Sequence, residues 1–97
     1  MALEPELKNK KVAELCQAFL KLKSQEECLR FLRDLCTFNE ISSMSERYHL
    51  AILLNKNIPY RKIALKTGAS TATITRVAQW LHHGMQGYKL VLGRLST

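Results

Sequence analysis

Residues 70–76 combine short hydroxyl and methyl side chains with a single arginine, and this set can contact nucleic acid. Hydroxyls form hydrogen bonds with base edges and phosphates, methyl groups contact the thymine methyl, and a guanidinium binds phosphate. Because the side chains are short, a helix that carries them can lie deep in a major groove of about 12 Å width. The residues that we select here are Ser70, Thr71, Ala72, Thr73, Thr75 and Arg76, with Arg61, Lys62 and Lys66 as phosphate contacts on the preceding segment.

The distribution of charge supports a polyanionic partner. All eight acidic residues lie within residues 1–46, where seven basic residues leave a balance of −1. From Arg47 onward there are eight basic residues and no acidic one, a balance of +8. A cationic half is expected where one face meets a polyanion, although a solvated basic surface explains the composition equally well.

The segment before these residues has the signals of a short helix followed by a tight turn. Pro59 suits the first turn of a helix over residues 59–67, where its missing N–H costs nothing. Ile63 is expected to face inward, and Ala64 is small enough for another helix to pass close by. Gly68 can adopt the left-handed conformation that ends a helix.

A second helix is expected to begin at Ser70 or Thr71, either of which can cap it. Ile74 and Val77 would pack it against the first helix, so helical periodicity leaves Thr71, Ala72, Thr75 and Arg76 pointing outward. The spacing of Ala64, Gly68 and Ile74 is typical of a helix-turn-helix, which we place at about residues 59–83. The alternative is a bare helical hairpin with a threonine-rich turn.

The rest of the chain predicts an all-α fold in one domain over residues 1–97. Apolar residues at helical spacing indicate a helix over about residues 5–23, and Ser24 with Glu27 forms a capping box that opens the next one. The expected buried stripe of that next helix is Cys28, Phe31, Leu32 and Leu35.

Two further capping signals follow, at Thr37 with Glu40 and at Ser43 with Glu46. They predict a turn or short helix before a longer helix that ends near Asn55 and buries its leucines. These leucines are Leu50, Leu53 and Leu54. Residues 88–92 alternate briefly, but a lone strand would have no partner, so we expect a helix there too.

At this point the chain resembles the Trp repressor family, particularly its YerC/YecD-like branch. The resemblance rests on Gly68-Ala69 and residues 72–76, extends back to Leu53-Leu54 and forward to residues 87–92, and covers about residues 25–95. It implies an all-helical, intertwined homodimer that acts as a transcriptional regulator, with two recognition helices one DNA turn apart. Pairing would also give a small chain a larger core.

The resemblance further implies an effector site in which Thr73 and Arg76 match family positions. Val77 stands where the family has glycine, and Trp80 replaces a small polar residue, so the side chains would fill the space for tryptophan. The family's second pocket arginine falls on Glu46 without a gap and on Arg47 with a gap of one residue. We therefore expect that tryptophan does not bind, and the effector stays unknown.

Other chemistry is not indicated by the sequence. Three cysteines without a Cys-x-x-Cys pair suit a reducing cytoplasm, and we expect Cys16, Cys28 and Cys36 to be small core residues. The adjacent His82 and His83 point about 100° apart on a helix, so they cannot chelate one metal together. We expect no cofactor, no metal, no catalytic site, no secretion signal and no membrane span.

The sequence thus predicts a cytoplasmic, sequence-specific DNA-binding transcriptional regulator, a repressor, which binds double-stranded DNA as a homodimer. The alternative is a helix-turn-helix protein-interaction module whose basic half binds an acidic partner.

Overall fold

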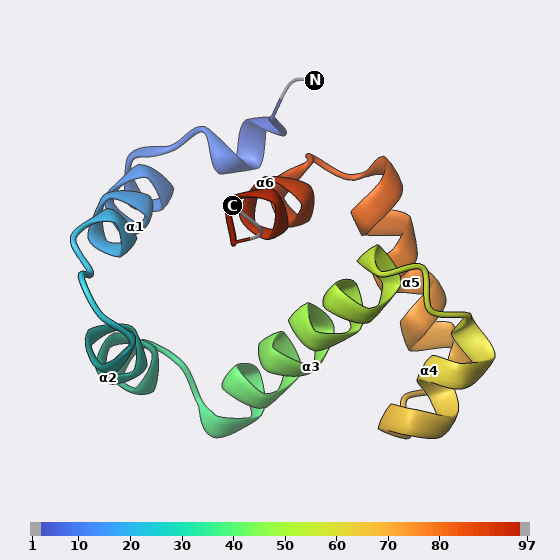
Figure 1. Ribbon diagram of the computed structural model, residues 1–97. Helices are drawn as coiled ribbons and strands as arrows, with labels where there is room; N and C mark the ends of the chain where they lie inside the picture. The colour runs from blue at the N-terminus through green and yellow to red at the C-terminus, as the bar shows by residue number, and fades with distance from the viewer. Residues whose placement is uncertain (1–2, 96–97) are drawn as a thin grey trace. The chain divides into compact units, whose positions relative to one another are not determined.

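The computed structural model describes residues 3–95, and every regular element in this range is a helix (Figure 1). The all-α prediction is confirmed. In chain order the elements are a 3-10 turn η1 (Pro5–Leu7), α1 (Lys10–Leu20), α2 (Gln25–Leu35), α3 (Phe38–Asn55), α4 (Tyr60–Thr67), α5 (Thr71–His83) and α6 (Gly87–Leu95).

The described residues form two compact units that divide within α3, between Ile41 and Ser42. The first unit holds α1, α2 and the first turn of α3. The second holds the remainder of α3 with α4, α5 and α6. All residues proposed to bind DNA belong to the second unit.

In the first unit the helix starts are set by side-chain caps. The Asn9 side-chain oxygen accepts a hydrogen bond from the Val12 N–H at 2.9 Å, so the helix predicted over residues 5–23 divides into η1 and α1. Ser24 caps α2 as predicted and accepts from the Glu27 N–H at 3.1 Å. The Glu27 carboxylate reaches one residue further back, to the Lys23 N–H at 2.8 Å.

No described residue of the first unit is fully buried within the single chain. The aromatic rings of Phe19 and Phe31 meet edge to face at 5.3 Å, but both α1 and α2 keep apolar side chains in solvent. The expectation of core cysteines is wrong: Cys16 and Cys28 are exposed and Cys36 is partly exposed. The buried stripe predicted for α2 is also wrong, since Cys28 and Leu35 are exposed and Phe31 and Leu32 are only half-buried. Two short helices have too little surface to enclose a core by themselves.

The helix α3 is continuous, so the predicted turn or short helix before it is wrong. Thr37 and Glu40 do form a capping box: the Glu40 N–H donates to the Thr37 hydroxyl at 3.1 Å, and the Thr37 N–H donates to the Glu40 carboxylate at 2.8 Å. The backbone hydrogen bond and then the side-chain hydrogen bond from Thr37 lower the pKa of Glu40. Ser43 and Glu46 lie inside the helix, where the same pair of residue types marks no end.

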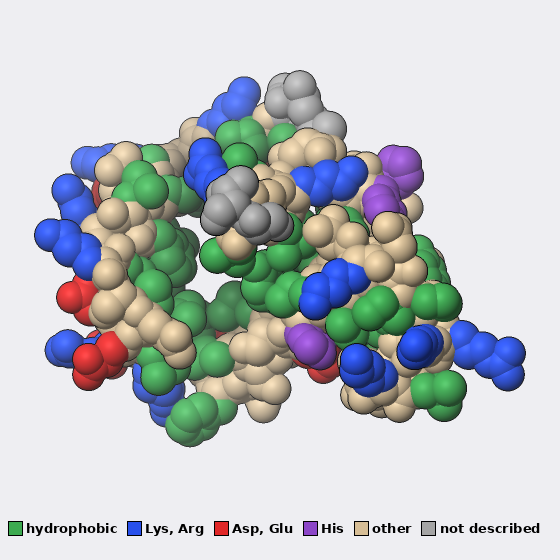
Figure 2. All heavy atoms as spheres, in the orientation of Figure 1, with side chains coloured by type: hydrophobic (Ala, Val, Ile, Leu, Met, Phe, Trp, Pro, Cys, Tyr) green, Lys and Arg blue, Asp and Glu red, His purple; other side chains and the backbone are tan. Residues whose placement is uncertain are grey.

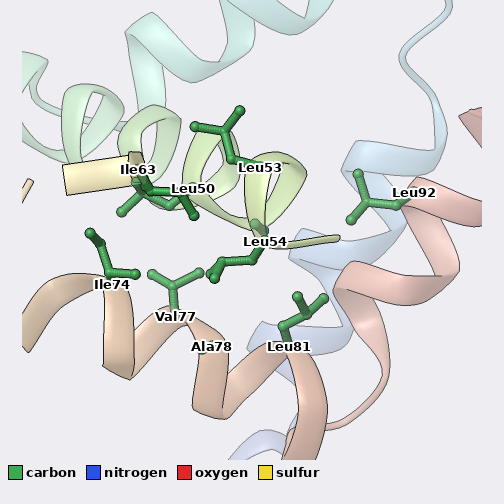
Figure 3. Close-up of a cluster of buried hydrophobic side chains, with 10 residues drawn as sticks. Leu50, Leu53, Leu54, Ile63, Ile74, Val77, Ala78, Leu81 and Leu92 are labelled. Carbon is green, nitrogen blue, oxygen red and sulfur yellow. The ribbon is translucent and has the colours of Figure 1, made fainter. Parts of the chain in front are cut away.

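The second unit encloses the hydrophobic core (Figure 3). Side chains from α3, α4 and α5 point toward one another, and α6 adds one leucine at the end of the cluster. The ten buried residues are Leu50, Ala51, Leu53, Leu54, Ile63, Ile74, Val77, Ala78, Leu81 and Leu92. The inward positions predicted from periodicity on α3, α4 and α5 are confirmed.

Residues 3–95 contain no helix that is both long enough and apolar enough to cross a membrane.

Two glycines in this unit differ in the space that an added methyl group would have. A Cβ at Gly84, which ends α5, would collide with the backbone carbonyl oxygen of Trp80. A Cβ at Gly93, inside α6, would meet nothing within 4 Å. We expect Gly84→Ala to lower the free energy of unfolding by about 1–3 kcal/mol, because backbone must shift.

Gly93→Ala is the matched control and should raise the free energy of unfolding by about 0.5–1 kcal/mol, because alanine loses less backbone entropy in a helix. Urea unfolding at one fixed protein concentration measures both. Equal effects of the two substitutions would contradict the assigned close contact at Gly84.

Candidate nucleic-acid interface

The helix α4 is delimited by the two residues that the sequence indicated. Pro59 is the residue immediately before the first helical position, one place earlier than predicted. Gly68 has φ 76° and ψ 2°, which is the left-handed conformation expected of it. Its N–H donates to the Ala64 carbonyl at 2.9 Å and ends the helix.

Thr67 fixes the turn between α4 and α5. Its hydroxyl donates to the Ile63 carbonyl at 2.8 Å and accepts from the Ala69 N–H at 3.1 Å. The two bonds connect the last turn of α4 to the segment leading into α5, so the direction of that segment is held from both sides. The sequence interpretation did not identify this role of Thr67, because a threonine at a helix end has many possible partners.

Ser70, and not Thr71, caps α5. The Ser70 hydroxyl accepts from the Thr73 N–H at 3.1 Å and donates to the Thr73 hydroxyl at 2.9 Å. Thr73 is partly buried and is used in this cap. It therefore stands apart from the outward row of predicted DNA-binding residues.

The outward row itself lies on one face of α5. Thr71, Ala72, Thr75 and Arg76 are all exposed, and they border one shallow hollow of about 730 Å³. Gln79 and Trp80 border the same hollow, one turn further along. The sequence interpretation left these two out, although their spacing of four residues from Thr75 and Arg76 places them on the same face.

The cations of α4 are solvent-exposed. Arg61, Lys62 and Lys66 are each exposed, and Figure 2 shows Lys and Arg side chains gathered over this helix. No Asp or Glu follows Glu46 in the sequence, so no acidic side chain from that half of the chain neutralises them. The result is a positive surface on the helix that precedes α5.

A second cavity, of about 390 Å³, lies between α3 and α5. It brings Arg47 together with Thr73 and Arg76, which are the two residues matched to the family's effector site. Arg47 lines this cavity and Glu46 does not, so the arrangement is consistent with the alignment that has a gap of one residue. The remaining lining residues are Met44, Val77, Trp80 and Tyr88.

Val77 and Trp80 differ in how they border this cavity. Val77 is only 2% exposed and contributes its side chain to the core, whereas Trp80 is 56% exposed. Trp80 also borders the outer hollow described above and an apolar groove of about 530 Å³ that contains Tyr48, Met85 and Tyr88. Trp80 therefore borders three surfaces of the second unit: the cavity with Arg47, the outer hollow and the apolar groove.

The remaining candidate ligands do not form a site in the described part of the chain. The rings of His82 and His83 lie 6.4 Å apart at the end of α5. Within residues 3–95, no three His, Cys, Asp or Glu side chains gather closely enough to hold a metal ion.

Comparison with known proteins places this geometry in a family. The family model described as "Trp repressor protein" matches residues 10–96. The protein YerC of Bacillus subtilis is 44% identical over 90 residues, which cover 93% of this chain and 86% of YerC. A "Trp operon repressor homolog" of Chlamydia trachomatis serovar D is 42% identical over 65 residues, covering 62% of this chain and 69% of that protein.

The fold agrees with a solved structure as well. The crystal structure of a TrpR-like protein from Eubacterium eligens superimposes with a TM-score of 0.90 and 46% sequence identity, and the match covers 97% of both chains. The chain therefore belongs to the Trp repressor family.

Proposed function

We propose that this protein is a sequence-specific DNA-binding transcriptional regulator, a repressor, that places α5 in the major groove. The observation that carries the proposal is the row Thr71, Ala72, Thr75 and Arg76, which is exposed on a single face of α5. Family membership supports the same conclusion, because the relatives include Trp operon repressor homologs.

The chemistry of the row suits a groove. Ala72 and the threonine methyl groups can contact thymine methyls, and the hydroxyls of Thr71 and Thr75 can bond to base edges or phosphates. The side chains are short, so the helix backbone can approach closely. Arg61, Lys62 and Lys66 on α4 would bind the phosphates beside the groove, and together with Ser70 and Thr73 at the helix start they complete the proposed DNA-binding set.

A homodimer is part of the proposal. The first unit keeps apolar faces exposed on both α1 and α2, which a second copy of the chain would cover. In the second unit the Tyr48 hydroxyl is shielded from solvent yet has no hydrogen-bond partner within residues 3–95. Twofold symmetry would set the two recognition helices about 34–36 Å apart on DNA.

The effector site is proposed at the cavity that contains Arg47, Thr73 and Arg76. Two guanidinium groups favour an anionic ligand. Tryptophan is not expected to be that ligand, because Val77 stands where the family has glycine and Trp80 borders the remaining space.

Substitutions in the outward row should weaken DNA binding. Arg76→Ala should weaken DNA binding by about 1–3 kcal/mol and Thr75→Ala by about 1 kcal/mol, because each removes a contact without touching the core. Gel-shift titration of a fragment enriched on the purified protein measures the affinity, and circular dichroism checks the fold. Arg30→Ala, an exposed arginine on α2, is the matched control. If both α5 variants keep the affinity of the unchanged protein, the recognition surface is assigned wrongly.

The salt dependence of binding separates DNA binding from the alternative of an acidic protein partner. If a dimer makes about 6–10 phosphate contacts, binding to duplex DNA should weaken about 10³–10⁵-fold between 50 and 200 mM salt, because counterions are released. Gel shifts on random genomic fragments over a salt series provide the measurement. Absence of any shift at low salt would favour the protein-interaction module.

Thermal unfolding tests whether tryptophan binds to the proposed effector site. L-tryptophan should leave the melting temperature unchanged, because a ligand that does not bind the folded state cannot stabilise it. Differential scanning fluorimetry with an extrinsic dye measures this at fixed protein concentration. A clear rise with L-tryptophan, and none with L-alanine, would show that the cavity admits the indole in spite of Val77 and Trp80.

A further inference from the structure

Trp80 is the only tryptophan in the sequence, and more than half of its surface is in solvent. An aromatic side chain of this size gains more from burial than almost any other residue. Its indole borders the outer hollow of α5 together with Arg76 and Gln79. Trp80 also borders the apolar groove with Tyr48 and Met85, so its large exposed surface lies between that groove and the hollow with Arg76 and is available to a partner.

The spacing along α5 indicates where that partner lies. Ala72, Arg76 and Trp80 follow one another at steps of four residues, so they form one row on the helix. Eight residues span about 12 Å along the axis. This length is comparable with the width of the major groove, about 12 Å. A helix whose axis crosses the groove and whose first turn reaches the base edges would therefore bring residue 80 to the sugar–phosphate wall.

We propose that Trp80 contacts the DNA backbone, with its ring packed on a deoxyribose and its Nε1–H donating to a phosphate oxygen. This proposal rests on the proposed DNA binding and adds to it a residue outside the set predicted from sequence. The indole N–H is a donor without acceptor capacity, which suits a phosphate oxygen. Arg76 attracts phosphate to the same edge of the hollow, and the sequence after Glu46 has no carboxylate to compete.

A contact with a second copy of the chain is the other way to cover Trp80. The charge distribution favours DNA, because Arg76 and Trp80 border the same hollow and none of the residues lining it is acidic. A symmetric subunit contact through the same face of α5 would bring two cationic faces together. The experiment below separates the two.

Fluorescence of Trp80 is a direct readout, because no other tryptophan contributes to the emission. The full chain is titrated with an enriched duplex at a protein concentration where sedimentation shows one constant oligomeric state. We expect the emission to shift and acrylamide quenching to fall as DNA saturates the protein. Gel shifts on the same samples report binding independently.

Substitutions distinguish a backbone contact from a loss of charge. Trp80→Ala should weaken the affinity about tenfold, the value of one lost hydrogen bond to a charged group. It should leave the slope of affinity against salt unchanged, because a neutral indole releases no counterion. Lys62→Ala should lower that slope by about 0.9 for each lost phosphate contact.

Two more variants serve as controls. Trp80→Phe keeps a ring but loses the N–H, so its affinity for DNA should lie between that of Trp80→Ala and that of the unchanged protein. Leu90→Ala removes an apolar side chain of similar exposure from α6, outside the outer hollow, and should leave the affinity unchanged.

Three results would overturn the proposal. If DNA binds but neither the quenching of Trp80 nor the affinity of Trp80→Ala changes, Trp80 is not a contact and the proposed DNA-binding function still stands. If Trp80→Ala dissociates the oligomer, the indole is a subunit contact. If the unchanged protein binds no duplex even at low salt, the proposed function fails, and the Trp80 contact fails with it.

Discussion

The direction of α5 depends on the burial of three branched side chains across a single turn. Ile63 from α4 and Ile74 and Val77 from α5 are enclosed with Leu50 of α3, and each buried side chain of this kind contributes about 1.5–3 kcal/mol. Gly68 permits the reversal because its left-handed backbone carries no Cβ, and the Thr67 hydroxyl connects the two sides of the turn. Burial thus sets the angle between the two helices, and the turn fixes where the second one starts.

The same periodicity that builds the core also creates the outward surface. Along α5, positions 74, 77, 78 and 81 are buried, and positions 71, 72, 75, 76, 79 and 80 are exposed. Over the first three turns only Thr73, which is partly buried and bonded to the Ser70 cap, belongs to neither set. A shift by one residue would place a threonine or arginine in the core and an isoleucine in solvent, which carries a large desolvation cost. The core therefore specifies which side chains face a ligand.

The parts of the fold that follow from neighbouring residues could be predicted from sequence, and those that follow from distant ones could not. The left-handed Gly68, the Ser24 cap and the inward leucines of α3 need only local spacing. The burial expected for Cys28 and Leu35 was wrong because it depends on surface that residues 3–41 do not supply within one chain. The repeated capping signal at Ser43 was misleading because the same residue pair is tolerated inside a helix. Arg47 could be placed beside Arg76 only by the structure, since periodicity does not locate a gap in an alignment.

Arg76 and Trp80 border hollows on two sides of α5. Both side chains border the cavity that contains Arg47, and both border the outer hollow that faces the proposed DNA. An anion held by Arg47 and Arg76 would draw the guanidinium inward and remove it from a phosphate outside, since one cation cannot satisfy both sites fully. The core residue Val77 directly follows Arg76 in the sequence and packs α5 against the core. An anion in the cavity would therefore compete with the DNA phosphates for the guanidinium of Arg76.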